Sequence, residues 1–138
     1  MPNHPNPTLR LTIARLARRM RSQRARDDIS DGQLAVLFGL LQHGPLSIGE
    51  LSTRERVTPP SMNRIVNAIE DAGFVSRGSS PDDGRKVIVT LTDAGLEITQ
   101  ETLRRRDAWF AQRLSQLAPE KLAILRAAEP VLRELAEE

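Results

Sequence analysis

The sequence predicts a mainly α-helical fold that contains one small β-hairpin. Over most of the 138 residues, apolar side chains recur every three or four positions, as they do along amphipathic helices. Between residues 74 and 91 the spacing changes to two, which is typical of β-strands. Proline, glycine and capping residues separate these segments. Because the length suits one domain, we expect residues 1–138 to form a single domain.

The composition excludes several classes of function. Cysteine is absent, and the only two histidines, His4 and His43, are far apart in the sequence. Disulfides, thiol chemistry, a histidine-rich metal centre and an activated nucleophile are therefore not expected. The longest apolar run, residues 34–41, is much shorter than the about 20 residues that span a membrane, and the N-terminus lacks the apolar stretch of a signal peptide. We expect a soluble, cytoplasmic protein that is not an enzyme and holds no metal or cofactor.

The basic residues are concentrated near the N-terminus. Residues 1–26 contain seven arginines and no acidic residue, whereas the rest of the chain is acidic, so the net charge is only +2. Arginine can hold a phosphate through two N–H groups at once, which favours a nucleic-acid partner. Exposed arginines on a helix also occur simply as solvated residues, so this signal is not specific.

The first two expected helices cover residues 8–25 and 31–43. The first has arginines on one face and apolar residues at helical steps on the other: Leu9, Ile13, Leu16 and Met20. The second is apolar on almost every side, which predicts a place in the core. Gly44 and Pro45 should end it.

Two shorter helices follow, each with a clear start signal. Ser47 and Glu50 have the spacing of a capping box, which predicts a helix to about Arg56. Thr58 precedes two prolines, which predicts the cap and first turn of a helix that ends before Gly73. The stripe that this helix is expected to bury consists of Ile65, Ile69 and Ala72, with Val66 alongside.

A β-hairpin is expected directly after this pair of helices. Its strands should cover residues 74–77 and 87–91, on either side of a turn-rich tip at residues 78–84. A hairpin that follows a helix–turn–helix is typical of a winged helix, whose second helix enters the major groove in DNA-binding examples. We therefore expect a winged helix-turn-helix over residues 31–91.

The C-terminal part should contain a long helix from Thr92 to about Leu117 and a last helix over residues 119–136, which Pro130 should kink or split. The long helix has a narrow apolar seam, typical of a helix that packs on another helix: Leu96, Leu103, Phe110, Leu114 and Leu117. Together with the apolar stripe of the first helix, this seam is more apolar surface than one small chain can hide. We therefore expect a homodimer.

Five residues are candidates for contact with DNA. Near the start of the second helix, Asn63 can pair with adenine, Arg64 with guanine, and Ser61 with a base or a phosphate. At the hairpin tip, Arg85 suits a narrow minor groove, and Asp83 could orient it. Each pattern also has a plainer interpretation: ordinary exposed helix residues in the first case and an incidental surface charge pair in the second.

Three stretches of the sequence resemble the MarR family of bacterial transcription regulators, and the resemblance extends over residues 9–135. Residues 60–66, followed by Ile69-Glu70 and Gly73-Phe74-Val75, resemble that family's recognition helix and first wing strand. Asp83-Gly84-Arg85 matches its Asp-x-Arg wing motif. Residues 89–95 resemble its second wing strand and the cap of its long helix.

This resemblance implies a homodimer in which the helices of residues 8–26 and 92–136 intertwine. It also implies a repressor that binds a pseudo-palindromic operator of double-stranded DNA and is released by a small phenol or aromatic acid. By the same resemblance, Ser61, Asn63 and Arg64 would meet bases or phosphates, and Arg85, steadied by Asp83, would enter the minor groove. The residues that would hold an effector are unknown. The chain departs from the family pattern at two positions, with Ser80 in place of a common Asp and Arg56 in place of a common Gly.

Two other functions are compatible with the pattern. A winged helix can bind a protein and not DNA, in which case Arg85 would have no special role. Residues 8–26 could also form a basic amphipathic helix at a membrane surface, although they lack Trp and Phe anchors.

Overall fold

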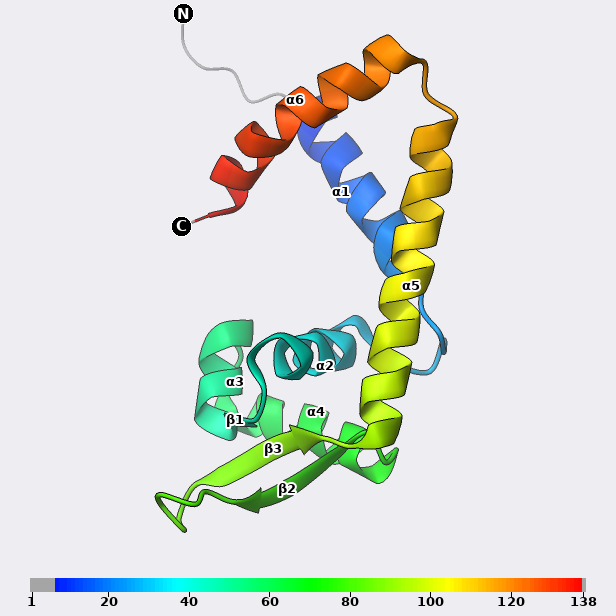
Figure 1. Cartoon of the computed structure of the whole chain (residues 1–138). Helices are drawn as coiled ribbons and strands as arrows, with labels where there is room; N and C mark the ends of the chain where they lie inside the picture. Colours follow the sequence, from blue (N-terminus) through cyan, green and yellow to red (C-terminus); the bar gives the residue numbers. More distant parts are fainter. Residues whose placement is uncertain (1–6, 138) are drawn as a thin grey trace, which may run out of the picture.

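The computed structural model describes residues 7–137, which form six α-helices and one three-stranded antiparallel sheet (Figure 1). Residues 1–6, with His4, and residue 138 lie outside this part. The elements in chain order are α1 (Pro7–Arg21), α2 (Asp31–His43), β1 (Leu46–Ser47), α3 (Ile48–Glu55), α4 (Pro59–Asp71), β2 (Val75–Ser79), β3 (Val87–Leu91), α5 (Asp93–Ser115) and α6 (Pro119–Ala136). The predicted mainly α-helical class with a winged helix-turn-helix is confirmed.

The hydrophobic core lies within the winged helix-turn-helix. Figure 1 shows α2, α3, α4 and the sheet gathered at one end of the molecule, while α5 extends away from the sheet toward α6, with α1 alongside. The core contains Leu34, Leu37, Leu51 and Val89, which are almost fully buried. In contrast, no described residue of α1 or α6 is buried.

A side chain caps the start of four helices, α2, α3, α4 and α5. The hydroxyl of Ser47 accepts a hydrogen bond from the Glu50 backbone N–H at 3.1 Å, and the Glu50 carboxylate accepts one from the Ser47 backbone N–H at 3.3 Å. This capping box confirms the predicted start of α3. Thr58 caps α4 as predicted, and Ser30 with Gln33 forms a further capping box at α2.

The sheet has one strand more than the sequence indicated. The strand order is β1-β3-β2, and Leu46 in β1 pairs with Val89 in the central strand β3. The predicted hairpin of β2 and β3 is confirmed, with Val75 opposite Leu91. Because β1 has only two residues, it shows no period of its own, and only its pairing defines it as a strand.

The buried stripe of α4 differs from the expected one. Met62, Val66 and Ile69 are buried, whereas Ile65 is half-buried and Ala72 is exposed. Met62 belongs to the stripe because it lies one turn before Val66 on the same face. Ala72 falls beyond the end of α4 and caps it.

The structure corrects the expected end of the first helix and excludes one of the two outcomes expected of Pro130, the split. The first helix ends at Arg21 and not at residue 25, because the following backbone turns toward α5: the carbonyl of Gln23 accepts from Arg106 at 3.3 Å, and the N–H of Ala25 donates to Thr102 at 3.2 Å. Pro130 does not split α6, which continues to Ala136. The position is exposed, so water can satisfy the carbonyl that proline leaves without its helical donor.

Arg56, at the C-terminus of α3, adopts a left-handed conformation with φ 54° and ψ 43°. This explains why the family pattern has glycine here, since a side chain in this region costs about 1–2 kcal/mol. We expect Arg56→Gly to be more stable than Arg56→Ala by about 0.5–1 kcal/mol, because both lose the arginine side chain and only glycine relieves the strain. Urea unfolding of the two variants measures this difference; equal stabilities would contradict it.

Candidate nucleic-acid interface

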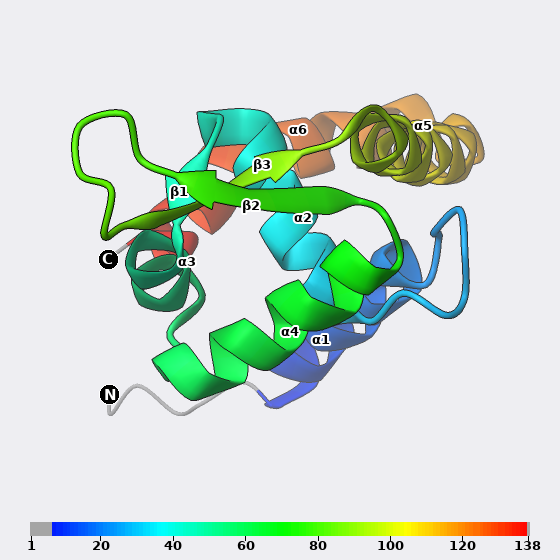
Figure 2. The same ribbon diagram turned by 90° about the horizontal axis from the view of Figure 1, so that it is seen from below.

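One face of α4 is free to meet a ligand. Met62, Val66 and Ile69 turn into the core, so at 100° per residue the opposite face carries Arg64 and Asn67. Both residues are exposed. Seen from below, α4 and the sheet that forms the wing lie on the same side of the molecule (Figure 2). A helix and a wing presented together are the two elements that a winged helix uses on DNA.

The N-terminal turn of α4 holds Ser61 and Arg64 in one hydrogen-bond chain. The Thr58 hydroxyl donates to the Ser61 hydroxyl oxygen at 3.0 Å, and the same oxygen accepts from Arg64 Nη2 at 3.3 Å. The Arg64 guanidinium therefore lies near the start of the helix, where the positive end of the helix dipole also attracts anions. Its contacts in this chain are exposed and easily exchanged for contacts to a base or phosphate.

Asn63 is held on both sides of its carboxamide. Its Nδ2 donates to the Pro59 carbonyl at 3.1 Å, and its Oδ1 accepts from Arg77 Nη2 at 3.4 Å. Arg77 lies on β2 and also forms an ion pair with Glu70 at 2.8 Å, so it joins the wing to α4. We did not anticipate Arg77 or Asn67 from the sequence. The available signal was a charged residue two positions after the buried Val75, on the same face of its strand.

The tip of the wing is shaped by side-chain contacts to the backbone. Asp83 Oδ1 accepts a hydrogen bond from the backbone N–H of Arg85 at 3.0 Å. Asp83 therefore stabilises the backbone of the turn. From the sequence we had expected it to orient the Arg85 guanidinium. The Ser80 hydroxyl accepts hydrogen bonds from the backbone N–H groups of Asp82 and Asp83 at 3.3 and 3.4 Å. A serine can therefore stabilise this turn as the aspartate common in the family would.

Arg85 and Lys86 are exposed at this tip. Within residues 7–137, the Arg85 guanidinium has no carboxylate partner. A hollow of about 390 Å³ lies between the wing and the start of α3, and is lined by Ser47, Ile48, Gly49, Asn63, Lys86 and Val87. Hydrogen bonds from Ser47 keep the pKa of Glu50 below its ordinary value, and the charge of Lys86 adds to this effect.

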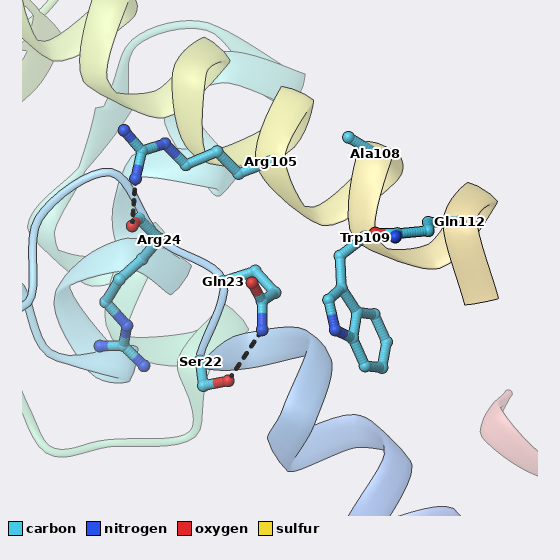
Figure 3. A pocket seen from close by; sticks show the side chains of 7 residues that line it. All are labelled: Ser22, Gln23, Arg24, Arg105, Ala108, Trp109 and Gln112. Carbon is cyan, nitrogen blue, oxygen red and sulfur yellow. Dashed lines mark hydrogen bonds between the residues drawn. The ribbon is translucent and has the colours of Figure 1, made fainter.

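A second hollow, of about 560 Å³, lies where the segment after α1 meets α5 (Figure 3). Its lining combines polar groups with one aromatic ring: Ser22, Gln23, Arg24, Arg105, Ala108, Trp109 and Gln112. Arg105 donates to the Arg24 carbonyl at 3.3 Å, and the Arg113 guanidinium lies 5.3 Å from the centre of the Trp109 ring. The hollow therefore places the Trp109 ring beside polar groups from two segments that are far apart in the sequence.

Across residues 7–137, no group of three or more His, Asp and Glu residues is arranged to hold a metal ion. None of the described helices combines the length and apolar character that a membrane crossing requires.

The fold and this surface define a winged helix-turn-helix protein, and comparison with known proteins agrees. A family model described as the MarR family matches residues 29–87. An uncharacterised HTH-type transcriptional regulator of Mycobacterium leprae is 39% identical over 130 residues, which cover 94% of this chain and 91% of that protein. The HTH-type transcriptional repressor MdtR of Bacillus subtilis is 31% identical over 94 residues, which cover 68% of this chain and 61% of that protein.

Solved structures show the same fold. A MarR family protein of Bacillus stearothermophilus superimposes with a TM-score of 0.79 at 25% identity, covering 95% of this chain and 92% of that chain. RV1404 of Mycobacterium tuberculosis has a TM-score of 0.84 at 22% identity, covering 100% and 99%. The chain belongs to the MarR family and is a DNA-binding transcriptional regulator. Members of this family bind DNA, act as dimers and are not enzymes, so the predicted non-enzymatic class is confirmed.

Proposed function

We propose that this protein is a homodimeric repressor that binds a pseudo-palindromic operator. In this proposal α4 enters the major groove, where Arg64, Asn63 and Ser61 meet bases or phosphates. Arg85 enters the adjacent minor groove, and Asp83 holds the turn that presents it. The main support for this proposal is that α4 and the wing lie on the same side of the molecule (Figure 2). Each has an exposed arginine, Arg64 on α4 and Arg85 on the wing. The repressor name of the Bacillus subtilis relative supports repression over activation.

The dimer is supported by apolar surface that one chain leaves uncovered. Residues of α1 and α6 that are 40–70% exposed include Leu9 at 53%, Leu11 at 56%, Ile124 at 69% and Val131 at 59%. So many exposed large apolar side chains on two helices indicate an interface. A two-fold dimer places two copies of α4 about 34–36 Å apart, one DNA turn, which requires a palindromic site. Residues 8–26 and 92–136 then form the dimerisation region, and residues 31–91 the DNA-binding region.

Arg64→Ala and Arg85→Ala should weaken DNA binding in different ways. A base contact by Arg64 is worth about 1–3 kcal/mol of discrimination, so its loss should lower operator affinity more than affinity for scrambled DNA. Arg85 in the minor groove responds to groove shape and phosphate charge, so its loss should weaken binding to both sequences and reduce the salt slope by about one. Binding isotherms for the operator, first selected from random DNA, and for scrambled DNA at several salt concentrations measure both effects.

An equal loss on both DNA sequences for Arg64→Ala would assign Arg64 to a phosphate. No change for Arg85→Ala would indicate that the wing does not touch DNA. That result would favour the alternative function, a winged helix that binds a protein and not DNA.

The effector is proposed to be a small aromatic acid or phenol held in the hollow beside Trp109. Arg105 lines this hollow and also forms an ion pair with Glu101 at 3.2 Å, and Trp109 supplies a ring for stacking. Because Trp109 is the only tryptophan, its fluorescence reports on this site alone. We expect a ligand from a panel of aromatic acids to quench this fluorescence and to lower operator affinity, and by linkage to bind less tightly to the DNA complex. A panel without any such compound would favour constitutive binding.

A further inference from the structure

Arg106 on α5 contacts three other parts of the chain. Its Nη2 donates at 3.3 Å to the carbonyl of Arg21, which ends α1. Its Nε donates at 3.3 Å to the carbonyl of Gln23 in the connecting segment, residues 22–30, which joins α1 to α2. Its guanidinium carbon lies 4.8 Å from the centre of the Phe38 ring on α2. Figure 1 shows α1 and the connecting segment beside α5.

The Arg106 guanidinium is a half-buried charge that has no carboxylate partner among residues 7–137. Burial lowers the pKa of Arg106 from its ordinary value, and the nearby charge of Arg24 lowers it further. An arginine nevertheless stays charged in a protein. Its surroundings are therefore two backbone carbonyls and an aromatic face, which together suit the planar guanidinium fork.

The DNA-binding region is attached to α5 at two places. The first is the start of α5, where the Thr92 backbone N–H donates to the Phe74 carbonyl at 3.0 Å and Ile98 packs against the core. The second is Arg106, eight residues after Ile98 and so about 12 Å further along the helix. Its partner Phe38 also packs against the core. A single attachment would leave a pivot, whereas two attachments fix the angle between the DNA-binding region and α5.

We propose that Arg106 is a positioning residue for DNA binding, which holds the DNA-binding region at the angle to α5 that matches the separation of the two half-sites. This inference rests on the proposed homodimer and its pseudo-palindromic operator. Arg106 itself does not touch DNA. Binding of the second half-site is an intramolecular step, so its strength depends on how well the second copy of α4 is placed. Loss of Arg106 should therefore weaken binding to the whole operator and spare binding to one half-site.

Arg106→Met tests this role, because it keeps an apolar side chain of similar length and removes the charge and the donors. The full-length protein is titrated with four DNAs: the operator selected from random DNA, one half-site alone, and operators with one base pair inserted or removed at the centre. One base pair changes the separation of the half-sites by about 3.4 Å and their relative rotation by about 35°.

We expect the wild type to bind the two altered operators at least roughly 10-fold more weakly than the selected operator, because their second half-site is out of place. Arg106→Met should reduce this ratio to about 3-fold or less, mainly because binding to the selected operator weakens. Its affinity for one half-site should equal that of the wild type. Arg106→Lys should give an intermediate ratio, since lysine keeps the charge beside the ring but not the planar fork.

Arg104→Met is the matched control, with the same substitution two positions earlier on α5. Arg104 is exposed and pairs with Glu101 at 2.9 Å, and Glu101 keeps Arg105 as a partner when Arg104 is replaced. This variant should keep the wild-type ratio. Phe38→Leu removes the ring from the other side of the contact and should lower the ratio in the same direction as Arg106→Met. It tests the contact even if Arg106→Met does not fold, which thermal unfolding shows.

The remaining outcomes separate this inference from the function on which it rests. A residue that acts only on stability would lower the affinities for all four DNAs by one factor and leave the ratio unchanged, which would overturn the positioning role. Unchanged affinities, or an equal loss on the operator and on one half-site, would also overturn it and leave the proposed function intact. A wild type that binds the operator no more tightly than one half-site would overturn the proposed function itself.

Discussion

Gly95→Ala should destabilise the protein by at least about 3 kcal/mol, which lowers the melting temperature by roughly 10 °C. A Cβ atom at this position would lie 1.9 Å from the carbonyl oxygen of Phe74 and 2.9 Å from its carbonyl carbon. Both are backbone atoms, so no rotation of a side chain relieves the overlap. The variant must move the start of α5 away from the wing.

The same junction explains why this overlap cannot be accommodated cheaply. Thr92 caps α5 through the N–H of Gly95, and its hydroxyl also donates to the Gly73 carbonyl at 2.6 Å. The Thr92 backbone N–H donates to the Phe74 carbonyl at 3.0 Å. A shift of α5 that admits a methyl group would strain or break these bonds, which join the DNA-binding region to the long helix.

Gly39→Ala is the matched control for this prediction. Gly39 lies within α2, and nothing stands within 4 Å of its Cβ position. Since alanine is favoured over glycine inside a helix, this variant should gain about 0.5–1 kcal/mol. Differential scanning calorimetry of both variants measures the two shifts, which should have opposite signs. A Gly95→Ala protein as stable as the wild type would show that α5 and Phe74 are not in close contact in solution.

Local signals in the sequence were sufficient for most of the helices. The capping box of Ser47 and Glu50 and the Thr58 cap are formed by residues three positions apart, so the sequence displays them directly. The period of two over β2 and β3 is equally local, because alternate residues of a strand face opposite sides. These elements could therefore be placed before any tertiary contact was known.

Features that depend on distant residues could not be placed in this way. The end of α1 is determined by Arg106 and Thr102, about 80 residues further along the chain, which bind the backbone after the helix. The strand β1 exists only because Leu46 pairs with Val89. In the candidate site, the sequence indicated that Arg64 and Arg85 are chemically suited to contact DNA. The contacts of Arg77 with Glu70 and Asn67 could not be predicted, because they depend on the packing of β2 against α4.

Ile124→Asp should convert the proposed dimer into a monomer. Ile124 on α6 is 69% exposed in the single chain, so the substitution leaves the fold of one chain little affected. In a two-fold dimer the residue occurs twice, and burial of each isoleucine contributes about 1.5–3 kcal/mol. The loss of both, together with two carboxylates at an apolar interface, should raise the dimer dissociation constant at least roughly 100-fold. Operator affinity should fall by a similar factor, because a monomer engages only one half-site.

Ala123→Asp is the matched control, since it adds the same charge one position earlier on the helix. Ala123 is also exposed and lies 100° around the helix from Ile124, away from the apolar stripe that Val131 and Leu135 continue. We expect this variant to remain a dimer with wild-type operator affinity. Sedimentation at micromolar concentration gives the association state, and circular dichroism shows whether helix content is retained. If Ile124→Asp remains a dimer, the apolar face of α6 is not covered by a partner chain and the proposed interface is wrong. A wild type that sediments as a monomer would also contradict the proposed interface.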